Sequence, residues 1–103
     1  MSKEKRNPAQ RLEIRDIRFV PTDAEEAKTG LRGFVSLVLN RSLKLDGLAL
    51  RQTREGRWTL SFPSKLDASG RRHFHVRPLD DATRREIEGQ VFKALGLGGA
   101  RKR

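Results

Sequence analysis

Two histidines, His73 and His75, carry the widest chemical repertoire in this sequence. Their spacing of two residues places both on one face of a predicted strand, where imidazole nitrogens can bind metal or transfer protons. Asp80 and Asp81 follow them in the chain. Two imidazoles do not complete a metal site, and the chain contains no cysteine that would supply thiolate ligands. We therefore predict neither a metal site nor a cofactor.

A hydrolytic site built on His75 and Asp80 would also need a nucleophile. Ser61, Ser64 and Ser69 are near in sequence, but none lies in the glycine-flanked turn that exposes a serine nucleophile. The absence of cysteine removes thiol nucleophiles as well. Since no set of acid, base and nucleophile can be assembled, we predict that the protein is not an enzyme.

Basic residues gather between positions 65 and 77, where Asp67 is the only acid and the net charge is +3. The basic residues are Lys65, Arg71, Arg72 and Arg77, and His75 lies among them. Such a cluster can neutralise phosphates and release their counterions. The alternative is a solvated loop whose charge serves solubility. We predict that these five residues contact nucleic acid.

Arg84 and Arg85 fall in the first turns of a predicted helix, where a positive charge opposes the helix dipole. This placement suggests that they extend the basic surface. The alternative is local pairing with Glu88 at helical spacing.

Three further motifs have structural interpretations. Trp58, Leu60 and Phe62 alternate as core residues do, although aromatic side chains in such a row also stack on bases in single-strand binders. We predict a core position, with Trp58 largely buried under the helix. The glycine-rich segment 96–99 follows a helix instead of opening one, so we interpret it as a linker and not as a phosphate loop.

Alternating apolar residues predict an antiparallel hairpin sheet of about five strands. The alternation changes phase at Arg15-Asp16 and at Asp46-Gly47, which indicates bulges. Asn40-Arg41 marks a tight turn. Asp46-Gly47 is also a hairpin signal, but the flanking strands would be too short. Residues 21–30 and 64–72 are predicted as loops, the first with room for one helical turn. The predicted strands are 12–20, 31–39, 43–50, 58–62 and 73–77.

Residues 81–95 are predicted as a helix. Ile87, Val91 and Leu95 recur every fourth residue, Asp80 or Asp81 supplies the N-cap, and Gly96 can close the C-terminus. Strands followed by one helix predict an α+β fold with the helix on one face of the sheet. Because several strands carry apolar residues in both phases, we expect a second copy to cover the other face in a homodimer.

The net charge of +10 over 103 residues favours polyanionic partners. More than half of this charge lies in two segments, a basic disordered tail at 1–11 and a glycine-rich linker with a basic tail at 97–103, which leaves one domain at 12–96. No stretch reads as a secretory signal or a membrane span, so we expect a soluble, cytoplasmic protein.

Residues 12–96 are similar to the stage V sporulation protein G (SpoVG) family. The marks are a strand that ends in Pro63-Ser64-Lys65, a loop with Gly70, a strand that ends at Pro78, and the helix at 81–95. LEIRDIRFV resembles the first strand of the family and LRGFVSLVLNRSLKL its hairpin. The chain departs from the family in the longer loop at 21–30, in Asp46-Gly47-Leu48, in its basic tails, and in the histidines at 73–77 where an acid is usual.

The resemblance implies a bacterial homodimer that binds DNA and RNA and regulates gene expression, including at sporulation and septation during cell division. It also implicates basic residues of the 64–77 region and of the helix in nucleic-acid contact. These departures concern which nucleic-acid targets the protein recognises, and not whether it binds nucleic acid. The rival interpretation is a protein-interaction adaptor that uses a sheet edge and the acidic 21–30 loop, with tails that serve solubility alone.

Overall fold

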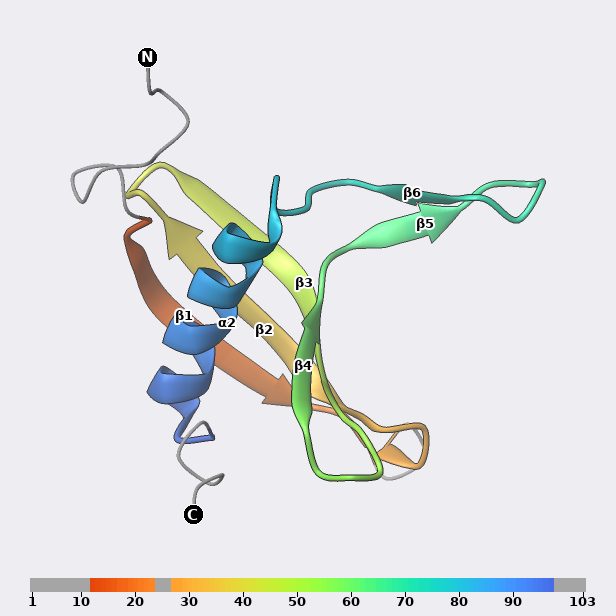
Figure 1. Cartoon of the computed structure of the whole chain (residues 1–103), viewed down its shortest axis with the longest axis horizontal. Coiled ribbons are helices and arrows are strands. Elements are labelled where there is room, and N and C mark those ends of the chain that lie inside the picture. Colours follow the sequence, from red (N-terminus) through yellow and green to blue (C-terminus); the bar gives the residue numbers. More distant parts are fainter. Residues whose placement is uncertain (1–11, 24–26, 98–103) are drawn as a thin grey trace.

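The computed structural model describes residues 12–23 and 27–97, so the predicted tail at 1–11 and most of the predicted linker lie outside the described residues. An antiparallel sheet with the order β1-β2-β3-β4 forms the body of the molecule, and α2 lies across one of its faces (Figure 1). Its elements are β1 (Ile14–Pro21), β2 (Leu31–Leu39), β3 (Leu43–Gln52), β4 (Trp58–Ser61) and α2 (Asp81–Leu95).

Two β-bulges occur at the predicted slips in phase. In β1 the register shifts between Arg15 and Arg18, with Asp16 in the left-handed region at φ 52°. In β3 the extra residue falls between Leu45 and Leu48, which pair with Leu37 and Val35. A third shift, in β2 between Leu31 and Gly33, was not predicted.

The bulge in β3 corrects one argument made from the sequence. Leu45 and Leu48 differ in sequence phase, yet the bulge lets both pair with buried residues of β2 and so face the helix. The leucines of β3, which fall in both phases of the sequence, therefore serve one face. They give no reason for a second copy to cover the other face.

The core lies between the sheet and α2. Leu37, Leu48 and Val91 are fully buried, and Ile87 joins them from the helix. Leu60 and Phe62 are buried in the same cluster, which confirms their predicted core position. Trp58 was predicted to be largely buried but is only half-buried at the margin of this cluster, because β4 is an edge strand.

The ends of α2 confirm the predicted helix. The Asp80 carboxylate accepts a hydrogen bond from the Thr83 amide at 2.8 Å, so Asp80 is the N-cap. Gly96 takes the left-handed conformation, φ 75°, that a helix C-terminus favours. A Cβ at Gly89 would meet no atom, so close packing does not explain this glycine. None of the described helices is long and apolar enough to cross a membrane.

Two short strands project from the body as a separate antiparallel hairpin (Figure 1). They are β5 (Ser64–Leu66) and β6 (Arg72–Phe74), and we call residues 64–77 the arm. The strand predicted at 73–77 is present as β6 but is shorter and ends at Phe74, whereas the loop predicted at 64–72 was wrong in part, because pairing begins at Ser64. The α+β class with hairpins and a C-terminal helix is confirmed, and the described residues form four strands in one sheet and two in another.

Candidate nucleic-acid interface

The register of the arm divides the predicted binding residues between two faces. Lys65 pairs with His73, so these two side chains share one face. Ser64 pairs with Phe74 and Leu66 with Arg72, which places these four on the opposite face. Lys65 and Arg72, predicted as members of one cluster, therefore lie on different faces of the hairpin.

Asp67 organises the tip of the arm. Its carboxylate accepts hydrogen bonds from the amides of Ser69 and Arg71, each at 2.9 Å, and from the Ser69 hydroxyl at 2.7 Å. The same group lies 2.7 Å from Nε2 of His73. The hydrogen bond to His73, followed by that of Ser69, holds the pKa of Asp67 well below its ordinary value of 3.8. Asp67 is therefore satisfied by the turn and by His73.

The arginines of the arm keep their charge available. Arg72 donates to the Ser64 hydroxyl at 2.6 Å, a neutral partner that orients the guanidinium without neutralising it. Within residues 12–23 and 27–97, no carboxylate forms an ion pair with Lys65, Arg71 or Arg77. The single acid of the segment is thus occupied by a histidine, and within these ranges four cations remain without a counter-charge.

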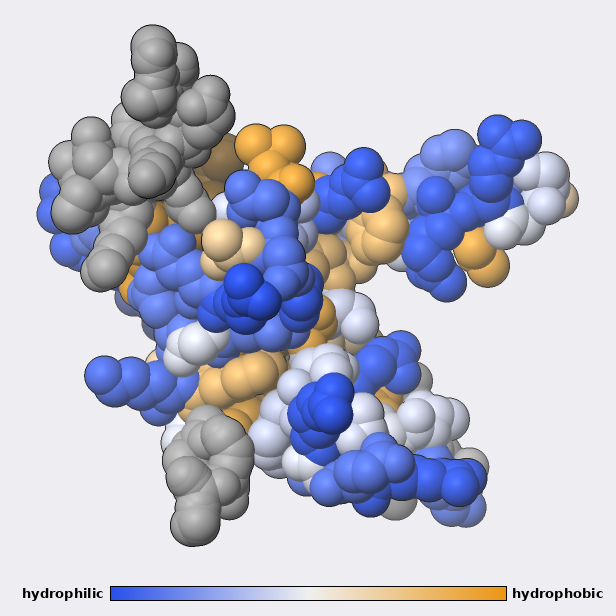
Figure 2. Space-filling model, viewed as in Figure 1, coloured by the Kyte–Doolittle hydropathy of each residue, from blue (hydrophilic) through white to orange (hydrophobic). Residues whose placement is uncertain are grey.

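The face of the arm that carries Arg72 also has apolar surface. The Arg77 guanidinium lies over the Phe74 ring, 5.6 Å from its centroid, and Leu66 is 56% exposed. Figure 2 shows the arm as a largely hydrophilic projection interrupted by hydrophobic residues. The exposure of Leu66, Phe74 and Leu79 was not predicted, because the apolar side chains of a projecting hairpin and of the segment after it have no core to pack against, and the sequence does not reveal this.

His75 follows β6, and its amide donates to the Pro63 carbonyl at 2.9 Å at the base of the arm. His73 and His75 were predicted to share one strand face, but the strand ends between them and His73 bonds instead to Asp67. Among the described residues, no three His, Cys, Asp or Glu side chains gather as metal ligands would.

Arg84 and Arg85 differ from the arm because both are ion-paired within α2. Arg84 bonds to Asp81 and to Glu88, and Arg85 lies 2.6 Å from the Asp81 carboxylate. The bond to Arg84 lowers the pKa of Asp81, and the bond to Asp81 raises the pKa of Arg84. The pairing with Glu88 that the sequence left open occurs for Arg84 alone. These two arginines are the weaker members of the predicted interface.

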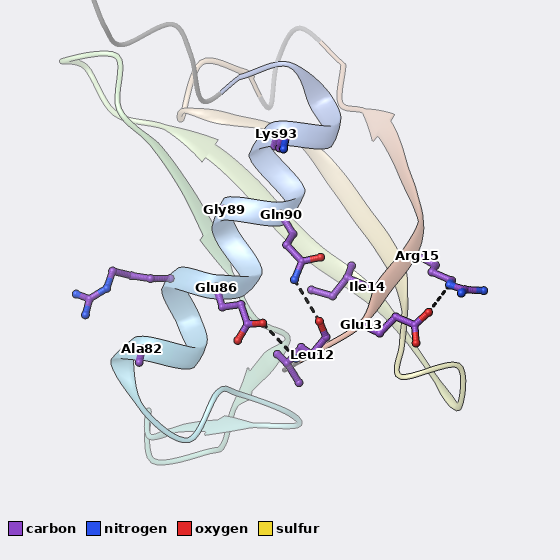
Figure 3. Close-up of a pocket in the computed structure, with 10 residues that line it drawn as sticks. Leu12, Glu13, Ile14, Arg15, Ala82, Glu86, Gly89, Gln90 and Lys93 are labelled. Atoms are coloured by element: carbon purple, nitrogen blue, oxygen red, sulfur yellow. Dashed lines mark hydrogen bonds and ion pairs between the residues drawn. The ribbon is translucent and has the colours of Figure 1, made fainter. Parts of the chain in front are cut away.

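An open groove runs between α2 and the start of β1 (Figure 3). Glu86 accepts a hydrogen bond from the Leu12 amide at 3.1 Å, and Gln90 donates to the Leu12 carbonyl at 3.3 Å. Arg85 and Lys93 also line the groove. Because its polar groups mainly hold β1 against the helix, we interpret this groove as structural.

Comparison with known proteins adds no relative. A scan against models of protein families finds no match, and a search of curated proteins finds none either. The resemblance to the SpoVG family therefore stays a prediction made from the sequence.

Proposed function

We propose that this chain is a nucleic-acid-binding regulatory protein of the SpoVG type that acts by binding and not by catalysis. The observation that carries the proposal is the arm, which presents Lys65, Arg71, Arg72 and Arg77 outside any described ion pair. Unpaired cations on an exposed hairpin suit phosphate contact, because their desolvation costs little and each contact releases counterions. His75 at the base of the arm, and Arg84 and Arg85 on α2, extend the proposed surface.

The test measures the affinity of the full chain for labelled DNA and RNA by fluorescence anisotropy over a range of salt concentrations. Replacing Arg71, Arg72 and Arg77 by glutamine should weaken binding and flatten its salt dependence, by about 0.7 to 0.9 in slope for each phosphate that the variant no longer neutralises. The melting temperature should change little, since exposed charges contribute little to stability.

The matched control removes the same charge from the N-terminal tail by replacing Lys3, Lys5 and Arg6 with glutamine. This tail variant should retain more affinity for nucleic acid than the arm variant does. If the tail variant loses more affinity than the arm variant, attraction by the tails explains the binding. If the full chain binds neither DNA nor RNA at low salt, the proposal is wrong.

We also propose a cytoplasmic homodimer. An isolated two-stranded hairpin is marginally stable, and the arm exposes Leu66 at 56% and Phe74 at 44%, so a second copy is a suitable partner for its apolar face. Sedimentation should give about twice the chain mass of 11.8 kDa. A monomer at high concentration would contradict this proposal. The same exposed residues favour the adaptor function if nucleic-acid binding fails.

A further inference from the structure

The face of the sheet opposite α2 has a composition unlike that of the core face. The register aligns Val20, Phe34, Ala49 and Ser61 in one row across all four strands. In the neighbouring rows Arg18 pairs with Ser36, Val38 lies between Arg15 and Lys44, and Arg51 pairs with Thr59. No described helix covers these rows, because α2 packs on the other face.

The charges of this open face are mostly positive and mostly unpaired. Among the described residues, no ion pair involves Arg18, Lys44 or Arg51, whereas Arg15 lies 2.6 Å from the Glu13 carboxylate. Glu13 is thus the acid paired with a residue of these rows, and two further acids, Asp16 and Asp46, lie in the bulges of β1 and β3. In the part of the chain that the structure describes, the face therefore presents three cations outside any ion pair, in the rows next to one that is apolar except for Ser61.

Phe34 is the aromatic residue of this row. It is 41% exposed in the middle of a strand, and its neighbours across the sheet, Val20 and Ala49, are smaller than the ring. An exposed ring on a central strand gains little for folding, but it offers a flat surface on which an unpaired base can stack. The exposed faces of other four-stranded sheets bind single-stranded RNA in this way.

A second copy of the chain fits this face poorly. Face-to-face packing would bring Arg18, Lys44 and Arg51 of two copies together without acids to compensate them, and like charges in an interface are costly. A polyanion, in contrast, would be attracted by these three cations. The hydroxyls of Ser36, Thr59 and Ser61 stand on the same face, where they can pair with ribose 2′-hydroxyl groups.

We propose that the open sheet face binds single-stranded RNA, with a base stacked on Phe34 and phosphates held by Arg18, Lys44 and Arg51. This inference rests on the proposed nucleic-acid function and gives it a second site, distinct from the arm. Phosphate contacts by the arm require no unpaired base, whereas stacking on Phe34 does. The two sites therefore differ in the form of nucleic acid they select.

The experiment measures the affinity of the full chain for a short labelled RNA of mixed sequence, for DNA of the same sequence, and for the RNA duplex. Phe34→Ala should weaken binding of single-stranded RNA about tenfold, the effect of removing one stacked base. Phe34→Leu should lose similar affinity and Phe34→Trp should retain it, because stacking needs a ring and not only apolar volume. Affinity for the duplex should change little.

A charge-matched pair tests the phosphate contacts. Arg18→Gln with Lys44→Gln should weaken single-strand binding, whereas Arg54→Gln with Arg57→Gln, in the turn between β3 and β4, should not. Circular dichroism of each variant should match that of the parent chain, since all these side chains are exposed.

The outcomes separate this inference from the proposed function. If the arm variant loses affinity while the Phe34 and Arg18/Lys44 variants bind normally, nucleic-acid binding stands and the sheet-face site is wrong. Equal loss by Phe34→Ala for single-stranded DNA and RNA would overturn the assignment to RNA. A change in sedimentation with Phe34→Ala, at unchanged RNA affinity, would make this face an interface between copies of the chain.

Discussion

The body of the molecule (β1 to β4 with α2) and the arm use apolar residues in opposite ways. In the body, Leu37, Leu48 and Val91 are fully buried between sheet and helix, and they hold the fold together. In the arm, Leu66 and Phe74 remain exposed while the hydrogen bonds of Asp67 shape the tip. Stability therefore depends on the body, whereas the proposed nucleic-acid contacts lie on the arm, and we expect that each can be altered without the other.

The largest expected effect on stability is that of a carboxylate placed in the core of the body, compared with the same carboxylate placed on the arm. Val91→Asp buries an unpaired charge in the core and should lower the free energy of unfolding by about 3 to 5 kcal/mol, enough to unfold a domain of this size. Leu66→Asp, on the exposed arm, should change the free energy of unfolding of a single copy by no more than about 0.5 kcal/mol, measured at a protein concentration low enough to keep the chain monomeric. Urea denaturation followed by Trp58 fluorescence measures both. Similar losses from the two variants would show that the arm is part of the folding unit.

A second comparison uses two glycines that are required for different reasons. A Cβ at Gly33, in β2, would overlap the Val20 carbonyl and the Phe19 ring, so Gly33→Ala should destabilise the body by about 1 to 3 kcal/mol. Gly70, in the arm, has free space but a φ of +87°. Gly70→Ala should cost about 1 to 2 kcal/mol of local strain.

Because the arm makes a separate sheet, the strain at Gly70 should speed amide hydrogen exchange in the arm and leave the global urea midpoint unchanged. Exchange measured by NMR on both variants tests this. A shift of the urea midpoint with Gly70→Ala as large as that with Gly33→Ala would contradict the separation of the two regions.

The smallest effect concerns the titration of Asp67. Because its pKa in the folded state is lowered, its ionised form stabilises the tip; this contribution is complete above about pH 4 and is lost as the pH falls through the folded pKa. Carboxyl NMR should show a midpoint well below 3.8. His73→Gln, which removes the largest cause, should raise the midpoint, while Lys65→Gln serves as a control on the same face. A midpoint at or above 3.8 in the parent chain would contradict the turn geometry.

Local chemistry made much of the body predictable from sequence. Asp80 and Gly96 mark the two ends of the helix, and both could be predicted because capping interactions act within a few residues. The bulge at Asp46-Gly47 was readable because the leucines around it change phase. The consequence of that bulge was missed: alternation counted along the sequence assigns Leu45 and Leu48 to opposite faces, whereas the folded register unites them.

The arm and the open face were harder to predict. β5 has no buried residue and was predicted as part of a loop, and the alternation at 73–77 predicted a strand but not its pairing with β5, which depends on the turn at Asp67. The charge cluster at 65–77 was visible, but its division between two faces depends on the register. Arg18, Phe34 and Lys44 come from three strands, and nothing in the sequence brings them together before the sheet forms.

The two edges of the sheet bear on how copies of this chain can meet. β1 carries a bulge at Asp16 and ends at Pro21, and the amide of Leu60 in β4 donates to the Glu88 carboxylate at 3.3 Å. Bulges, prolines and occupied amides are features that prevent a foreign strand from extending a sheet. Neither edge is therefore a template for strand addition. The proposed self-association should therefore not proceed by strand addition at either edge of this four-stranded sheet.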